Sequence, residues 1–296
     1  MKKLFKLILT AILILAAIYA YSKYIEPNNL TVKTLNISTQ KDIKDFKAVF
    51  FTDTHFGELY SVDNAQKISD KINSLNPDIV IFGGDLLDNY ARDKENIDFD
   101  KLSSALSSIT AKNGKFAVFG NHDIGGGAVR MYDDFMSSCG FTVLCDESVY
   151  IDEYNIKIVG FDDIMMSYTE QELYTLKSDY FNIIAAHEPE TAKYIQSHSD
   201  NFMLTGHTHG GQVYIPFLTD KILPPGSGGF RKGLYTQEEI NTNVSINLYV
   251  SSGIGLTKVP FRLFNTPEII EINFKKENWF FILALYLNKA PFLISK

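Results

Sequence analysis

Short apolar runs alternate with helix-like patterns along most of the chain. Runs rich in Val, Ile and Phe that end in polar residues or glycine are typical of buried strands. Among them, apolar residues recur at helical spacing, as at Ile68, Ile72 and Leu75 and again at Leu102 and Leu106. The runs that predict strands are Phe46–Thr52, Ile79–Phe82, Lys115–Phe119, Phe141–Leu144, Ile156–Phe161, Phe181–Ala186, Asn201–Leu204, Ile246–Val250 and Ile269–Ile272.

The number of these runs bears on the fold class. They are too many for one simple sheet, so we expect a layered α/β (α+β) fold in which two packed sheets are flanked by helices. No Pro- or Ser-rich linker divides residues 47–275, which predicts a single domain over that range. Residues 25–46 are expected to form a linker and an edge strand.

Both ends of the chain carry apolar segments. Three lysines lie within residues 1–6, and no charge follows from Leu7 to Ser22. Residues 1–24 therefore predict a membrane anchor or uncleaved signal with the lysines inside, and a cleaved signal peptide is the alternative. Residues 276–296 contain the apolar run Trp279–Leu287, which is too short to span a bilayer. This tail is expected either to lie as an interfacial helix or to pack on the domain.

Charge and cysteine content exclude some classes of protein. The chain has 28 Lys plus Arg against 35 Asp plus Glu, a formal net charge of −7. This balance argues against a general nucleic-acid binder, because phosphate affinity depends on clustered cationic side chains. Two cysteines, Cys139 and Cys145, are too few for a four-thiolate zinc site. They are expected either to pair outside the cell or to be ordinary small core residues.

Candidate chemistry follows the predicted strands. Five polar clusters each come directly after an apolar run, and they contain five of the six histidines of the chain. Loops after neighbouring strands converge on one crevice in α/β sheets, so we expect these clusters to meet. The clusters are Asp53-Thr54-His55, Gly84-Asp85, Gly120-Asn121-His122-Asp123, His187, and Gly206-His207-Thr208-His209.

The residue types indicate a metal site. Imidazoles, carboxylates and one amide, with no thiolate, suit divalent Mn, Zn or Fe. Their number exceeds the needs of one ion but would serve two ions about 3.5–4 Å apart. In the pairs Asp53/His55 and His207/His209, spacing of two residues would point both side chains to one side of an extended backbone. Asp88 is expected to cap a helix.

The ordered set of five clusters resembles the calcineurin-like metallophosphoesterase superfamily. Further stretches, including residues 229–235, 252–255 and 260–269, look like its membrane-associated YkuE/YaeI-like branch. The resemblance implies a four-layer αββα sandwich. It also implies that Asp53, His55 and His209 hold one metal, that Asn121, His187 and His207 hold a second, and that Asp85 bridges both.

The same resemblance implies catalytic roles outside the metals. His122 is expected to act on the leaving group or on the transition-state charge, as a titratable donor can. Asp123 is expected either to support His122 or to cap the glycine loop that follows it. Arg231 and Arg262 are candidates for gripping the substrate phosphate, although a solvated surface position is the commoner use of such residues.

These features together predict a dinuclear metal-dependent phosphohydrolase. A metal-bound hydroxide would attack phosphorus in phosphomonoesters or phosphodiesters of the cell envelope or of nucleotides. The expected location is the cell membrane, with a single span and an extracytoplasmic domain. The partners are a phosphoester and the lipid bilayer, with no specific nucleic acid. The alternatives are a pyrophosphatase of nucleotide-linked lipid precursors, a nuclease, and a catalytically silent metal- or lipid-binding module.

Overall fold

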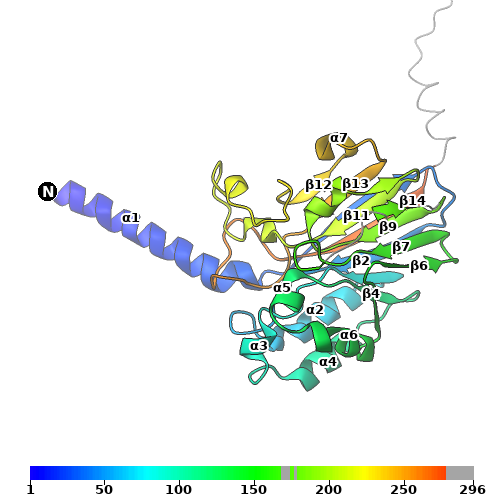
Figure 1. Ribbon diagram of the computed structural model, residues 1–296. Helices are drawn as coiled ribbons and strands as arrows, with labels where there is room; N and C mark the ends of the chain where they lie inside the picture. The colour runs from blue at the N-terminus through cyan, green and yellow to red at the C-terminus, as the bar shows by residue number, and fades with distance from the viewer. Residues whose placement is uncertain (168–173, 177–178, 278–296) are drawn as a thin grey trace, which may run out of the picture.

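Two six-stranded sheets form the centre of the molecule (Figure 1). The computed structural model describes residues 1–167, 174–176 and 179–277. The expected C-terminal run Trp279–Leu287 lies outside these residues. In the described part, the two mixed sheets confirm the α/β class with two packed sheets.

The first sheet has the strand order β1-β14-β2-β3-β4-β5. Strands β2 to β5 run parallel to one another, β14 is antiparallel to β2, and β1 is the parallel partner of β14 at the edge. The strands are β1 (Thr31–Thr39), β2 (Phe46–Phe51), β3 (Ile79–Phe82), β4 (Lys115–Ala117), β5 (Phe141–Val143) and β14 (Glu268–Lys276).

The second sheet has the order β12-β13-β11-β9-β7-β6. Its four central strands are parallel, and the edge strands β12 and β6 are antiparallel to their neighbours. The strands are β6 (Glu147–Ile151), β7 (Ile156–Gly160), β9 (Phe181–Ala185), β11 (Asn201–Thr205), β12 (Gly233–Tyr235) and β13 (Ile246–Val250). A separate two-stranded ribbon pairs β8 (Thr175–Leu176) with β10 (Gln196–Ser197).

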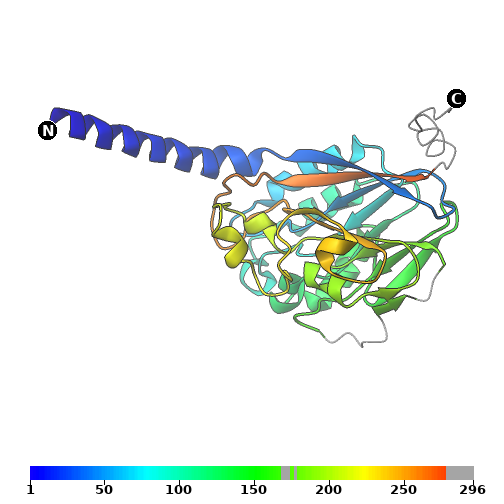
Figure 2. The same cartoon turned by 90° about the horizontal axis from the view of Figure 1, so that it is seen from above.

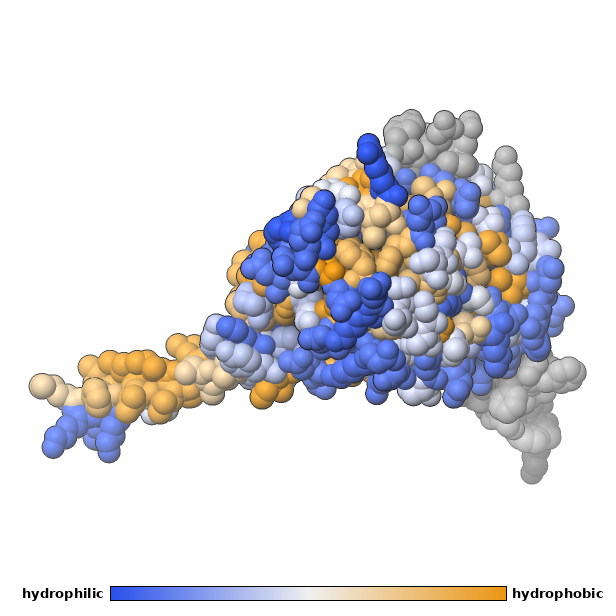
Figure 3. Space-filling view, turned by 90° about the horizontal axis from the view of Figure 1, so that it is seen from below, coloured by the Kyte–Doolittle hydropathy of each residue, from blue (hydrophilic) through white to orange (hydrophobic). Residues whose placement is uncertain are grey.

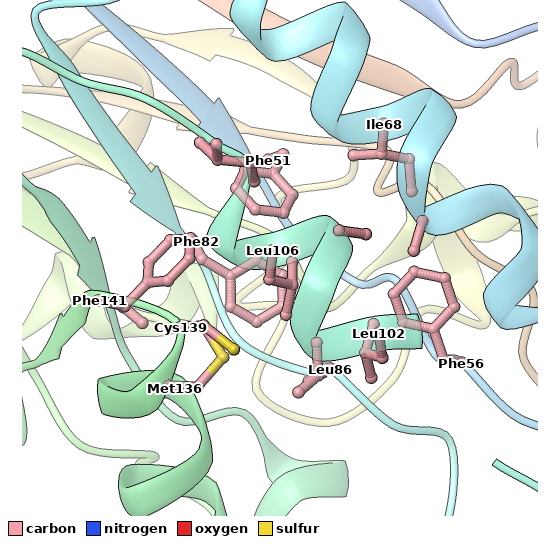
Figure 4. Packing of buried hydrophobic residues seen from close by; sticks show 14 of the residues in the cluster. Phe51, Phe56, Ile68, Phe82, Leu86, Leu102, Leu106, Met136, Cys139 and Phe141 are labelled. Atoms are coloured by element: carbon pink, nitrogen blue, oxygen red, sulfur yellow. The ribbon is translucent and has the colours of Figure 1, made fainter. Parts of the chain in front are cut away.

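Helices cover the outer face of the first sheet. Alternate residues of β2 and β3, such as Phe51 and Phe82, pack against Ile68, Leu106 and Met136 of three helices (Figure 4). The other residues of the same strands point between the sheets, where they form a second apolar core. The helices of this half are α2 (Ala65–Asn73), α3 (Tyr90–Asp93), α4 (Phe99–Ser107), α5 (Asn121–Gly125) and α6 (Val129–Ser138).

The outer face of the second sheet has a thinner cover. Its apolar residues pack against Ala192 of a 3-10 turn, Phe230 of a loop and Ile240 of a one-turn helix. Within the described ranges, this fourth layer therefore consists of short elements rather than the helical layer that the αββα expectation implies. The short elements in this cover are η5 (Pro189–Lys193) and α7 (Gln237–Ile240), while η6 (His209–Gly211) and η7 (Thr219–Lys221) follow β11 in the chain.

The N-terminal helix projects from the domain. Helix α1 (Lys2–Ala20) has no buried residue and leaves the body of the molecule, as Figures 1 and 2 both show. It continues through η1 (Tyr21–Ile25) and η2 (Glu26–Asn28) into β1. This helix is long and apolar enough to cross a membrane, and a signal sequence near an N-terminus has the same character. Cys139 and Cys145 are both free.

Candidate metal centre

The seven expected metal ligands all follow the C-terminal ends of parallel strands. Asp53 and His55 come after β2, Asp85 after β3 and Asn121 after β4 of the first sheet. His187 comes after β9, and His207 and His209 after β11 of the second. The two sheets therefore deliver side chains to one place from opposite sides. Asn121 is half-buried, and the other six are buried.

The backbone turns sharply at these ligands. Five of the seven adopt a positive φ, a region that non-glycine residues seldom occupy and that costs free energy unless the surroundings hold it. This backbone turn lies just after the extended strand in each case. The five are Asp53 (φ 53°), His55 (φ 42°), Asp85 (φ 58°), His207 (φ 68°) and His209 (φ 50°).

Two glycines allow the carboxylate ligands to come close to neighbouring loops. A Cβ atom on Gly206 would collide with the Asp53 carboxylate, and a Cβ on Gly120 would collide with the Asp85 carboxylate. The absence of a side chain at these positions is therefore a packing requirement.

One group of ligand atoms comes from Asp53, His55 and His209. The Nε2 atoms of His55 and His209 lie 2.9 Å apart. Oδ1 of Asp53 lies 3.5 Å from Nε2 of His209 and 3.8 Å from Nε2 of His55. These three residues form one of the buried groups that could hold a metal ion.

The second group comes from Asn121, His187 and His207. Nδ1 of His207 lies 2.9 Å from Oδ1 of Asn121, and Nδ1 of His187 lies 2.8 Å from the Gly83 carbonyl. A carbonyl only accepts hydrogen bonds, so His187 is protonated at Nδ1 and would bind a metal through Nε2. Burial disfavours the charged form of His187, but the Asp85 carboxylate, 3.1 Å from Nε2, outweighs it and raises the pKa of His187 well above its ordinary value.

Asp85 lies between the two groups. Its Oδ2 atom is 3.3 Å from Nε2 of His55 and 3.1 Å from Nε2 of His187. Its Oδ1 atom accepts a hydrogen bond from the backbone N–H of His122 at 2.8 Å. The carboxylate is thus held in place through one oxygen while the other faces ligands of both groups, which is the arrangement that a bridging ligand needs.

Burial and the neighbouring carboxylates compete in setting the charge of the histidines in the cluster. Burial lowers the pKa of His207 to about 4 and that of His209 well below its ordinary value, so both imidazoles are neutral and can bind a metal. Burial also disfavours the charged form of His55, but the Asp53 and Asp85 carboxylates outweigh it and raise the pKa of His55 to about 9. A proton on His55 thus compensates part of the buried negative charge, and a bound cation could take that place.

The donor set fits divalent metal ions. Two ligands that each lie about 2.1 Å from one ion are separated by roughly 3–3.4 Å, and several separations in this cluster are close to that range. The neutral imidazoles of His207 and His209 supply lone pairs, and His187 supplies one when a cation displaces its Nε2 proton. The carboxylates supply the charge that a dication requires.

His122 lies beside the cluster at the edge of a cleft. Its side chain is 28% exposed, and its ring centroid is 4.6 Å from that of His55. Nδ1 lies 2.6 Å from the Asp88 carbonyl and must therefore donate, which leaves Nε2 as the atom that can exchange a proton. The cleft, about 400 Å³ in volume, is lined by Asp88, Asn89, Arg92, Asn121, His122, Gly125, Gly126, Met166, Thr257 and Lys258.

The carboxylate of Asp123 is bonded to the backbone, whereas Nδ1 of His122 is bonded to the Asp88 carbonyl. Its fully buried carboxylate accepts hydrogen bonds from the backbone N–H groups of Gly120, Asp85 and Leu86, at 2.8–3.0 Å. Burial and the neighbouring Asp85 carboxylate raise the pKa of Asp123 to about 7. Asp123 therefore ties the loop after β3 to the loop after β4 and positions Asp85 rather than a proton donor.

Arg262 is placed differently from the sequence expectation. Its guanidinium is fully buried and donates to the carbonyls of Ser252, Gly255 and Asn265, so it cannot reach a substrate in the cleft. One of its nitrogens lies 3.3 Å from Nδ1 of His209. Arg262 is therefore a structural residue behind the metal cluster, and its burial lowers its own pKa to about 10.

Arg231 lies near the cluster but is already paired. Its guanidinium is 2.7 Å from the Asp220 carboxylate and stacks over the Tyr214 ring at 4.3 Å. It also approaches the Gly210 carbonyl beside His209. Arg231 is absent from the residues that line the cleft, where the exposed cations are Arg92 and Lys258.

Three neighbours of the cluster were not predicted as part of it. Asp88 was expected to cap a helix, but Asn89 caps the next helix instead. Oδ1 of Asp88 lies 3.4 Å from Nδ1 of His55, and its Oδ2 lies 2.7 Å from a guanidinium nitrogen of Arg92. Glu188 is buried beside His187, and neither of its carboxyl oxygens has a hydrogen-bond partner among the residues described. Asn265 donates its side-chain amide to the His209 carbonyl.

Comparison with known proteins agrees with this geometry. Residues 46–211 match the calcineurin-like phosphoesterase family, and that range contains both ligand groups. The chain therefore belongs to the calcineurin-like metallophosphoesterases and carries the buried Asp/His cluster of a metal site. The resemblance inferred from the motifs is confirmed.

Three relatives place the chain within that family. It is 31% identical over 270 residues to the uncharacterized metallophosphoesterase YkuE of Bacillus subtilis (strain 168), which covers 88% of this chain and 91% of YkuE. It is 26% identical over 259 residues to the phosphodiesterase YaeI of Escherichia coli (strain K12), at 85% and 90% coverage. A transmembrane protein with metallophosphoesterase domain from Danio rerio is 28% identical over 292 residues, covering 91% of this chain and 62% of that protein.

Proposed function

We propose that this protein is a dinuclear metal-dependent hydrolase of phosphomonoesters or phosphodiesters. The observation that carries the proposal is the position of Asp85, whose Oδ2 atom faces His55 of one ligand group and His187 of the other. The relationship to the phosphodiesterase YaeI supports ester hydrolysis. Cell-envelope or nucleotide phosphoesters are the proposed substrates.

The seven ligand residues would bind two metal ions. Asp53, His55 and His209 would hold one ion, Asn121, His187 and His207 the other, with Asp85 shared. Bound divalent ions such as Mn, Zn or Fe would lower the pKa of an attacking water and compensate the charge of the phosphate.

The cleft supplies the remaining roles. His122 presents Nε2 to the cleft and can give a proton to a leaving oxygen, because its Nδ1 atom is fixed on the Asp88 carbonyl. Lys258 lines the cleft and can attract a phosphate, whereas Arg92, which also lines it, is paired with Asp88 and Asp93. Asp123 keeps the Asp85 and Asn121 loops together, so it acts on the reaction through the ligands it positions.

Removal of metal tests the proposal directly. Hydrolysis of bis(p-nitrophenyl) phosphate should fall by about 10³-fold or more when the protein is stripped with a chelator, since bound metals contribute several kcal/mol of transition-state stabilisation. Adding back Mn²⁺, Zn²⁺ or Fe²⁺ should restore the rate, with two ions bound per chain by mass spectrometry. Stoichiometric metal binding without turnover of mono- or diesters would contradict the proposal and favour a silent metal-binding module.

We further propose that residues 1–24 are a retained anchor, that residues 25–46 join it to the domain, and that the domain of residues 47–275 lies outside the cytoplasm. Burial of the segment beyond α1 supports retention. The Ser22 carbonyl accepts a hydrogen bond from the backbone N–H of Arg262. The buried Glu26 carboxylate accepts hydrogen bonds from the backbone N–H groups of Phe264 and Asn265. The lysines before the apolar run support the orientation.

Protease treatment of intact spheroplasts tests retention and orientation together. We expect the domain to be digested while a tag placed before Lys2 stays protected, and we expect the protein extracted from membranes to keep its N-terminus. A soluble product lacking residues 1–24 would contradict retention. A domain that resists protease until the cells are lysed would contradict the orientation and favour an enzyme acting at the cytoplasmic face.

A further inference from the structure

Large apolar side chains are exposed on two loops beside the base of α1. Phe217 is 87% exposed, Phe264 71% and Ile222 67%. A contiguous apolar area on a protein surface marks an interaction site, and Figure 3 shows hydrophobic residues at the end of the domain that carries α1. We define the anchor-side surface as the set Ile215, Phe217, Leu218, Ile222 and Phe264.

The two loops are joined to each other and to the base of α1. Val213 and Leu263 form a β-bridge, and Tyr214 N–H donates to the Leu263 carbonyl at 2.8 Å. Phe264 N–H donates to the Glu26 carboxylate at 3.0 Å. Both ribbon views place these loops next to the end of α1 (Figures 1 and 2). The position of the anchor-side surface is therefore fixed relative to the helix.

The apolar helix is too short to cross the bilayer and also leave a linker between the membrane and the domain. A helix rises 1.5 Å per residue, so crossing a hydrocarbon core of about 30 Å takes about 20 residues. The uncharged stretch from Leu7 to Ser22 is no longer than this, and Lys6 and Lys23 bound its two ends. Ser22, at its end, is only 3% exposed because it is already packed in the domain. A spanning α1 would thus bring the base of the domain to the bilayer surface.

Tyrosine residues surround α1 at the end where the bilayer surface would meet the base of the domain. Tyr19, Tyr21 and Tyr24 are exposed around the end of the apolar stretch, and Lys23 lies 5.8 Å and 5.4 Å from the rings of Tyr19 and Tyr24. Tyrosine and lysine are enriched where a spanning helix leaves the hydrocarbon core. This tyrosine belt surrounds the segment to which the anchor-side surface is attached.

We propose that the anchor-side surface lies in the interfacial layer of the bilayer that α1 spans, with Phe217 and Phe264 inserted among the lipids. The inference rests on the membrane anchor proposed above. A lipid occupant is favoured over another protein because the surface is continuous with the lipid-facing helix and lies at the level of its tyrosine belt. Asn265, next to Phe264, bonds to the His209 carbonyl, so the metal ligands are held directly behind this surface.

Site-specific quenching tests the inference in the full-length protein. The exposed thiol of Cys145 is removed as C145S, and single cysteines carrying a bimane label are introduced by F217C and F264C. The protein is reconstituted in vesicles of phosphatidylethanolamine and phosphatidylglycerol with or without dibrominated lipid. We expect dibrominated lipid to reduce emission at both positions, because bromine quenches only over short distances.

Two further labels serve as references. I12C, in the middle of α1, should be quenched by the brominated chains, and Y150C on β6, half exposed and remote from α1 in Figure 1, should not. Quenching at position 12 without quenching at 217 and 264 would overturn the inference while leaving the anchor intact. Absence of quenching at position 12 would show that the anchor itself had failed, and the inference with it. Emission at 217 that depends on protein concentration and not on bromine would assign the surface to a second copy of the chain.

Discussion

Asp85→Asn is expected to abolish hydrolysis of bis(p-nitrophenyl) phosphate, with a fall of at least about 10³-fold, the order found when one essential polar group is deleted from a preorganised site. Oδ2 of Asp85 lies within 3.3 Å of imidazole nitrogens from both ligand groups. The substitution removes a negative charge from the point that the two metals would share. We expect the purified variant to hold fewer than two ions per chain by mass spectrometry.

The same change should leave the fold intact. An asparagine can still accept the His122 N–H through its side-chain oxygen, and loss of the charge relieves the buried Asp123 carboxyl, whose pKa Asp85 helps to raise. The melting temperature of the metal-free variant should nevertheless fall, because burial is outweighed by His187 and His55, which hold the pKa of Asp85 well below its ordinary value and so make its charge stabilising. Asp78→Asn at the opposite end of β3 is the matched control, because Asp78 also accepts a backbone N–H but lies away from the cluster. A variant that keeps two metals and parental turnover would refute the bridging role.

Much of the metal site could be predicted because its residues follow strands. The apolar runs before Asp53, Asp85 and Asn121 belong to neighbouring parallel strands of one sheet, and parallel strands end at the same edge. The short spacing of His207 and His209 added a local signal. The positive φ of both histidines could not be predicted from the sequence, because it depends on contacts with loops that are distant in the chain.

The residues that were misplaced depend on non-local contacts. Arg262 is buried because carbonyls of Ser252, Gly255 and Asn265 surround its guanidinium, and the sequence does not reveal that these loops close around it. Asp88 precedes a helix, which favoured a capping role, yet in the fold its carboxylate contacts His55 from the loop after β2. A charged side chain can be assigned from sequence only when its partners are local.

The outer layers differ for a similar reason. Helix α6 was not predicted, because only Tyr132 and Met136 of its residues are buried and the rest are polar. The cover of the second sheet was expected to be helical, but Phe230 and Ala192 reach its apolar face from loops and short turns. Apolar periodicity identifies the buried face of a sheet, whereas it does not say which kind of element covers that face.

His122→Gln is expected to keep both metals and to lose about 10²- to 10³-fold in kcat, the range typical of a positioned general acid. The His122 ring is more exposed than the ligands, and its Nδ1 atom is fixed on the Asp88 carbonyl, so the substitution changes what faces the cleft more than what holds the metals. Metal content by mass spectrometry and kcat for a diester measure the two effects separately. His198→Gln, at an exposed histidine, is the matched control and should change neither.

The leaving group distinguishes proton donation from a merely structural role. p-Nitrophenolate departs without a proton, whereas an alkoxide needs one, so the loss in His122→Gln should be larger for an alkyl ester than for the p-nitrophenyl ester. An equal loss for both esters would mean that His122 stabilises charge or shape rather than the departing oxygen. Loss of one metal ion would instead make His122 a ligand, which the proximity of His122 to His55 and Asp85 permits geometrically. Retention of metal together with a leaving-group-dependent rate is therefore the result that assigns the proton to Nε2 of His122.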